Sequence, residues 1–217
     1  PEQAAGSASR RITISGRVQG VGFRPFVYRL AQQHGIKGWV RNVNGAVEIQ
    51  AEGDASRLQR FSDALLGEAP PLSAPGPLSV VACPSEHAAS FSILDSQSGS
   101  AACPNDAASK MADAWSIHLP ADGFVCADCL AELHDPANRR HRYPFINCTQ
   151  CGPRYTLIAA LPYDRPNTSM HDFPLCADCR REYENPLDRR FHAEPIACPV
   201  CGPHLQFVSG EDQQNSD

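Results

Sequence analysis

Hydrophobic and polar residues follow a regular pattern in the first part of the chain, and the pattern predicts a small α+β unit. Ile12 and Ile14 alternate with polar neighbours, as in a strand with one buried face. Further strands are expected at 39–43, 47–52, 78–82 and 91–94. Apolar residues recur every three or four positions over 26–34 and 58–66, which is the spacing of one helical face. The order βαββαβ is that of a ferredoxin-like domain.

Glycine, asparagine and aspartate mark where these elements should end. Gly35 follows the first helical segment, and glycine ends helices because it adopts the left-handed conformation without strain. Asn44 and Gly45 form a two-residue hairpin signal between the second and third strands. Asp54 can cap the second helix through its side chain.

The second half of the chain contains an internal repeat with an offset of 50 residues. Residues 126–153 align with 176–203, and 13 of the 28 aligned positions are identical. Each copy holds two CxxC pairs with 18 residues between them, which indicates duplication of one small unit. The chain is therefore divided into a first domain (10–95), a linker (96–125), a first unit (126–153), a connector (154–175), a second unit (176–203) and a tail (204–217).

Eight of the ten cysteines lie in these CxxC pairs: Cys126, Cys129, Cys148, Cys151, Cys176, Cys179, Cys198 and Cys201. A secreted disulfide scaffold is the competing interpretation, but the first residues contain no apolar stretch typical of an export signal. We therefore expect thiolate metal sites in a reducing, cytoplasmic compartment. Four thiolates favour Zn²⁺, with iron as in rubredoxin as the alternative, and they leave no open position for catalysis.

The sequence thus predicts two structural zinc ions, each held by the four cysteines of one copy. If one ion took a CxxC pair from each copy, folding would have to order about 50 residues between these pairs. This costs more chain entropy than closing the shorter loop within one copy. His141 and His192 lie beside the cysteines and are expected to pack or support rather than to ligate. Cys83 and Cys103 are expected to be unpaired thiols. The units should act as a scaffold that leaves the first domain to work independently.

Charge and hydropathy argue against two classes of partner. The net charge is −5, and residues 126–203 hold nine Arg, no Lys and ten acidic residues. Each zinc–tetrathiolate site adds about two negative charges, whereas binding to a phosphate backbone requires positive charge. The basic run 139–142 is expected to be a solvated or docking face. A zinc-ribbon nucleic-acid adaptor is therefore disfavoured, and no apolar run approaches the roughly 20 residues of a membrane span.

The segment between the first strand and the first helix carries the candidate chemistry of the first domain. Gly20 and Gly22 allow several backbone N–H groups to point into one concavity, and the start of a helix adds positive potential. Arg24 adds a planar cation suited to phosphate. The segment is either an oxyanion cradle or a tight turn with a surface arginine.

Residues 17–24 (RVQGVGFR) and 38–42 (GWVRN), followed by a hairpin, closely resemble the acylphosphatase family over residues 10 to about 95. The resemblance implies that the enzyme is a hydrolase of acyl phosphates in which Asn42 orients the attacking water. It also implies that phosphate is held by the loop amides and Arg24. The implied phosphate-binding residues are Gln19, Gly20, Val21, Gly22, Phe23 and Arg24.

An acylphosphatase domain followed by two Cys₄ units resembles the HypF family of carbamoyltransferases, which mature nickel–iron hydrogenases. The segments that carry this resemblance are YPFINC (143–148), PYDRP (162–166) and DRRFHA (188–193). The resemblance implies carbamoyl phosphate as substrate, and a HypE-type acceptor protein for the parent enzyme. The domains for the later steps would lie beyond the second unit. A non-catalytic module that only binds phosphate remains the rival interpretation.

Overall fold

The structure, a computed structural model, describes residues 7–43, 45–97 and 121–206. Asn44, Cys103, and most of the expected linker and tail lie outside these residues. Among the described residues, no helix has the length and apolar character that crossing a membrane requires.

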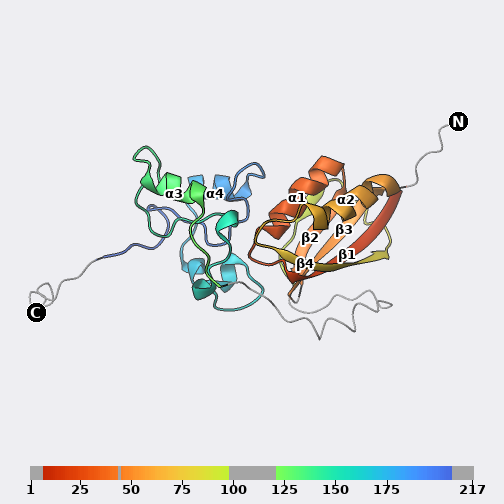
Figure 1. Cartoon of the computed structure of the whole chain (residues 1–217), viewed down its shortest axis with the longest axis horizontal. Helices are drawn as coiled ribbons and strands as arrows, with labels where there is room; N and C mark the ends of the chain where they lie inside the picture. The colour runs from red at the N-terminus through yellow and green to blue at the C-terminus, as the bar shows by residue number, and fades with distance from the viewer. Residues whose placement is uncertain (1–6, 44, 98–120, 207–217) are drawn as a thin grey trace, which may run out of the picture.

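The first region is a five-stranded sheet with two helices on one face (Figure 1). Its elements are β1 (Ser7–Arg17), α1 (Phe23–His34), β2 (Lys37–Val43), β3 (Ala46–Asp54), α2 (Ala55–Gly67), β4 (Ala74–Ala82) and β5 (Phe91–Ile93). The strand order is β4-β1-β3-β2-β5, and all neighbours are antiparallel except β5, which pairs parallel with β2. The predicted ferredoxin-like α+β fold is confirmed.

The core of this region lies between the sheet and the helices, where the predicted apolar positions meet. Its fully buried members include Ile12, Ile14, Val27, Val40, Ile49, Leu58, Phe61 and Leu65. Leu66, which was expected on the same helical face, is 44% exposed because it lies about 100° around the helix from Leu65. The Asp54 cap forms as predicted, since its Oδ1 accepts a hydrogen bond from the Arg57 N–H at 2.8 Å.

The face of the sheet opposite the helices is also covered. The alternation of apolar and polar residues in β3 had predicted that this face is exposed to water. Gln50 and Glu52 are buried although they were expected to face water. Gln50 Nε2 donates to the Pro84 carbonyl at 3.2 Å, and a Glu52 oxygen accepts from the Glu86 N–H at 2.6 Å. The residues that follow β4 therefore close the outer face, and the buried polar groups of β3 are satisfied by that segment.

The second region contains two α-helices and several single 3₁₀ turns. They are α3 (Ala127–His134), η3 (Thr149–Cys151), η4 (Tyr155–Leu157), η5 (Arg165–Asn167), η6 (Ser169–Asp172) and α4 (Ala177–Glu184). Both α-helices begin directly after the first cysteine of a CxxC pair, so that the second cysteine lies in the first helical turn. The repeat in sequence is therefore a repeat in structure.

Arginines of each copy pair with a glutamate of the other copy, and these ion pairs hold the second region together. Arg140 donates to both carboxylate oxygens of Glu182, and Arg190 makes the equivalent ion pair with Glu132. The Nε of each arginine donates to a main-chain carbonyl of the other copy, at 2.8 and 3.0 Å. Burial alone would raise the pKa of Glu182, but hydrogen bonds from Arg140 and Arg139 outweigh it and lower the pKa to about 2.

These ion pairs correct the expectation that residues 139–142 form a solvated or docking face, but only for one residue of the run. Arg140 is only 1% exposed, and Arg139 pairs with Glu182 at 2.8 Å. Arg139, His141 and Arg142 are exposed. The run looks basic in sequence because the acidic partner lies more than 40 residues away in the other copy.

Candidate active site

The loop between β1 and α1 holds Gly20 and Gly22 in a backbone conformation that favours glycine. Gly20 and Gly22 have φ angles of 69° and 71°, in the left-handed region that glycine adopts without strain. The helix begins at Phe23, and the first N–H groups of a helix have no carbonyl partner within it. These groups and the positive end of α1 make the loop suited to an anion.

The second region packs directly onto this loop. A Cβ atom on Gly20 would lie 2.6 Å from the Pro153 Cβ, and one on Gly22 would lie 3.0 Å from the Thr149 Cβ. Both glycines are therefore required by close packing as well as by backbone conformation. The candidate site lies between the two regions rather than on the first alone, which revises the expectation that the first domain works independently.

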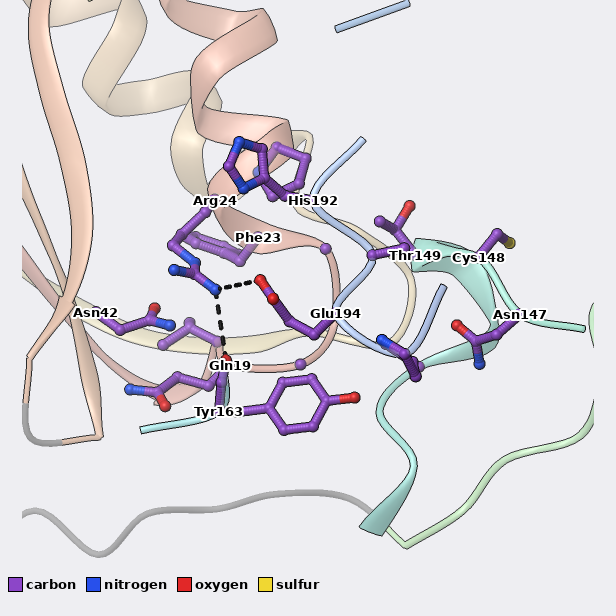
Figure 2. A pocket seen from close by; sticks show the side chains of 17 residues that line it. Gln19, Phe23, Arg24, Asn42, Asn147, Cys148, Thr149, Tyr163, His192 and Glu194 are labelled. Atoms are coloured by element: carbon purple, nitrogen blue, oxygen red, sulfur yellow. Dashed lines mark hydrogen bonds and ion pairs between the residues drawn. The ribbon is translucent and has the colours of Figure 1, made fainter. Parts of the chain in front are cut away.

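Arg24 is the side chain that joins the two regions. It is 8% exposed, and its Nη2 lies 2.7 Å from Asp164 Oδ1. This nitrogen also lies 3.0 Å from Glu194 Oε1, a contact that Figure 2 marks with a dashed line. The same nitrogen lies 3.4 Å from the Tyr163 carbonyl, and Nη1 lies 3.4 Å from the hydroxyl of Ser96. Burial opposes the charge of Arg24, but the two carboxylates outweigh it and raise the pKa of the guanidinium. The arginine is therefore a buried, charged group.

Glu194 is fixed in place by groups of the second region. Its Oε2 accepts from the Arg165 N–H at 2.9 Å and from the Tyr183 hydroxyl at 3.1 Å. The Arg165 guanidinium in turn donates to the Glu194 carbonyl at 2.7 Å. Burial raises the pKa of Glu194, and the charge of Arg24 opposes that rise. The carboxyl group is thus anchored on one oxygen and presented to Arg24 on the other.

Several buried polar atoms around the loop lack a partner within the described residues. They are Gln19 Oε1, Asn42 Oδ1 and both side-chain polar atoms of Asn147. These side chains and Arg24 line one cavity of about 30 Å³, which is large enough for water. Buried polar atoms normally have hydrogen-bond partners, so this cavity is suited to a polar ligand or water.

His192 lies against this cavity and not in either cysteine cluster. Its ring packs on Tyr183 with a centroid separation of 4.8 Å and on Phe191 at 4.7 Å. Burial, helped by the charge of Arg24, lowers the pKa of His192 to about 4. The ring is therefore neutral at neutral pH and adds no charge beside Arg24.

The cysteines form two clusters, and each cluster comes from one copy of the repeat. Cys126, Cys129, Cys148 and Cys151 make the first cluster, and Cys176, Cys179, Cys198 and Cys201 make the second, with ligand atoms within 4.8 Å of one another. Neighbouring sulfurs lie 3.6 to 3.8 Å apart. A tetrahedron with Zn–S bonds of about 2.3 Å has S···S edges of about 3.8 Å, so both clusters fit zinc.

In each cluster, an arginine from the other copy approaches a cysteine sulfur. Arg139 Nη2 approaches Cys179 Sγ at 3.2 Å, and Arg189 Nη1 approaches Cys129 Sγ at 3.1 Å. Four thiolates outweigh one Zn²⁺ by two charges, and these cations offset part of that excess. Cys83 is remote from both clusters and contacts Gln50 Oε1 at 3.2 Å.

Sequence reasoning identified Arg24 and Asn42 but missed Asp164 and Glu194. Asp164 lies in the connector between the copies, and Glu194 occupies a position where the first copy has Pro144. The signal that could have found Glu194 is a difference between the two copies. Positions with the same residue in both copies serve the fold that the copies share, whereas a residue present in only one copy can serve another role. Glu194 is a buried acid at such a position, and its partner lies 170 residues away.

Comparisons with known proteins agree with this architecture. A family model described as acylphosphatase matches residues 10–93, and one described as HypF finger matches residues 125–158 and 175–208. An acylphosphatase of Staphylococcus aureus is 45% identical over 62 residues, which is 29% of this chain and 70% of that protein.

Longer relatives cover both regions. Carbamoyltransferase HypF2 of Cupriavidus necator is 50% identical over 167 residues, which is 76% of this chain and 19% of the relative. A crystal structure of full-length HypF in the phosphate- and nucleotide-bound form matches with a TM-score of 0.84 and 42% identity, over 96% of this chain and 26% of that one. The chain thus spans about a fifth of the length of the curated HypF relative.

We expect the purified chain to hold two zinc ions, measured by elemental analysis. Cys126→Ser with Cys148→Ser alters one cluster, so this double variant should retain one ion. Cys126→Ser with Cys176→Ser alters both clusters and should retain none. If ligands were instead crossed between the copies, with each ion held by corresponding CxxC pairs, the two double variants would give the opposite result.

Proposed function

Because the chain belongs to the HypF family and begins with an acylphosphatase domain, we propose that its first domain hydrolyses acyl phosphates at the Arg24 site. The observation that supports this most strongly is a buried, charged arginine in the first turn of α1, where the first amides of a helix have no carbonyl partner within it. A surface turn would leave the arginine in water, whereas here it is 8% exposed. The alternative of a tight turn with a surface arginine is therefore disfavoured.

In the proposed reaction, phosphate lies in the loop, and Arg24 donates hydrogen bonds to it from the nitrogens that do not face Asp164 and Glu194. The loop amides and the arginine act on charge that is redistributed in the transition state, and they need little rearrangement because they are fixed beforehand. Asn42 is 2% exposed, and its Oδ1 has no partner among the described residues. That oxygen can accept a hydrogen bond from water and direct the water at phosphorus.

The leaving acyl group must depart on the side of phosphorus opposite the water. A second cavity, of about 450 Å³, adjoins the site and is lined by Arg24, Asp164, His192 and Glu194. It offers space for a small acyl group. Burial lowers the pKa of His192 to about 4, which makes the ring a weak base, so we assign the rate to positioning and electrostatics rather than to a general base.

The family suggests carbamoyl phosphate as the acyl phosphate. Water would cleave its P–O bond to give inorganic phosphate and carbamate. By analogy with the HypF carbamoyltransferases, other domains of the parent protein would then activate the carbamate with ATP as a carbamoyl-adenylate, releasing pyrophosphate. They would pass its carbamoyl group to a HypE-type acceptor and release AMP. Two structural zinc ions would fix the second region, because four thiolates leave no open position. The thiolate sites suit a reducing, cytoplasmic compartment.

Two other functions compete with hydrolysis. A module that binds phosphate without turnover would release no phosphate from a small acyl phosphate. A zinc-ribbon adaptor would bind nucleic acid in a salt-dependent way, but Arg139, Arg140, Arg189 and Arg190 are engaged within the second region. Phosphate release from carbamoyl phosphate and acetyl phosphate, compared with binding to a DNA or RNA duplex, separates these functions.

Arg24→Ala should lower kcat/KM for acyl phosphates by about 10²–10³, by analogy with loss of one oxyanion donor. Arg24→Lys should recover little, because one ammonium cannot contact two carboxylates and a phosphate from separate nitrogens. Arg29→Ala, on the exposed side of the same helix, is the matched control. Phosphate release is the measurement, and full activity of Arg24→Ala would refute the site.

Asn42→Ala should lower kcat about 10²-fold, the effect expected for a misplaced reactant. Inhibition by inorganic phosphate should stay the same, because the amide acts on water and not on bound phosphate. Steady-state kinetics with phosphate as competitor measure both quantities. A parallel loss of phosphate inhibition would make Asn42 a binding residue instead.

A further inference from the structure

We propose that Glu194 is a positioning residue for hydrolysis, which acts through Arg24 and makes the second Cys₄ unit part of the active site. The inference rests on the proposed acyl phosphate hydrolysis and adds to it a residue from outside the acylphosphatase domain. Three observations support it: the anchoring of Glu194, the way Arg24 uses its nitrogens, and the burial of both side chains.

Glu194 is held more firmly than a surface partner of an arginine would be. Its Oε2 accepts from a main-chain N–H, that of Arg165, and from the hydroxyl of Tyr183 on α4. Tyr183 lies in the helix that contains Cys179, and Glu194 precedes Cys198 by four residues. The position of the carboxylate therefore depends on the fold of the second cysteine cluster.

Arg24 meets the second region through one end of its guanidinium. Nη2 faces both carboxylates, at 2.7 Å for Asp164 and 3.0 Å for Glu194. Nη1 has only the 3.4 Å contact with Ser96, and no contact of the described residues engages Nε. This division leaves hydrogens on Nη1 and Nε for an anion, while Nη2 fixes the plane of the group.

Fixing this side chain before substrate arrives should favour the reaction. A free arginine samples many rotamers, and restricting them costs conformational entropy. The ion pairs with Asp164 and Glu194 meet that cost when the chain folds. Arg24 and Glu194 are 9% and 4% exposed at their side chains, so solvent screens this pair little.

A different role for Glu194 would be inhibition, in which its carboxylate occupies the place of the phosphate. The anchoring argues against this role, because leaving the site would break the bonds to the Arg165 N–H and the Tyr183 hydroxyl. The two roles predict opposite kinetic effects. Inhibition requires that removal of the carboxylate speeds hydrolysis, whereas positioning requires that it slows hydrolysis.

The test is Glu194→Gln in the full zinc-loaded chain. We expect kcat/KM for carbamoyl phosphate and for acetyl phosphate to fall about 10–10²-fold, as for a group misplaced by roughly an ångström. The inhibition constant for inorganic phosphate should rise. Glu184→Gln is the matched control: it also removes a carboxylate that pairs with an arginine, but this carboxylate is exposed and pairs with Arg180 on the same helix, 3.7 Å away, instead of with Arg24. It should keep the wild-type kinetics.

A double variant separates positioning from a general structural role. If Glu194 acts through Arg24, Glu194→Gln should cause no further loss of rate or of phosphate binding in the Arg24→Ala background. Zinc content and thermal unfolding, measured on every variant, should show two ions and a folded second region. Direct titration with inorganic phosphate gives the same comparison even if the chain shows no turnover, so failure of the proposed hydrolysis remains distinguishable.

Three results would overturn the inference. The first is unchanged kinetics and phosphate binding in Glu194→Gln, and the second is faster hydrolysis with tighter phosphate binding, which would mean inhibition. The third is a loss of rate in Glu194→Gln that follows loss of zinc or unfolding of the second region, which would mean a structural role only.

Discussion

The ion pairs of Arg24 with Asp164 and Glu194 are the interaction on which the rest of the arrangement depends. A buried arginine is costly unless it is paired and hydrogen-bonded, and among the described residues before the second region only Ser96, just after the first domain, contacts it, at 3.4 Å. The partners come from residues some 140 to 170 positions later in the chain. The cradle is therefore complete only when both regions are folded and in contact.

This constraint gives the duplicated cysteine units a role beyond stability. A unit of about 28 residues is too small to hold a core alone, so metal binding provides much of its folding free energy. Arginines of each copy then pair with glutamates of the other and hold the two copies together, as in the pair of Arg140 with Glu182. The copies together fix Tyr183 and the Arg165 main chain, which fix Glu194. Zinc is thus linked to the site through folding rather than through chemistry.

The sequence predicted what is local or periodic, and it missed what depends on pairing between distant segments. Strand alternation, helical spacing and turn residues gave the first domain, and the repeat gave the grouping of cysteines. The burial of Gln50 and of Arg140 was missed because their partners, Pro84 and Glu182, lie far along the chain. Glu194 was missed for the same reason, since nothing near it in sequence indicates a contact with Arg24.

The most direct measurement of the central claim is the rate of acyl phosphate hydrolysis by the full chain before chelation, after removal of zinc and after zinc is restored. If the second region completes the site, the rate should fall as the second cysteine cluster loses its ion and return when zinc is added back. Tyr183 and Glu194 would lose their fixed positions in the metal-free chain. An unchanged rate in the metal-free chain, with the second region shown to be unfolded, would contradict this account.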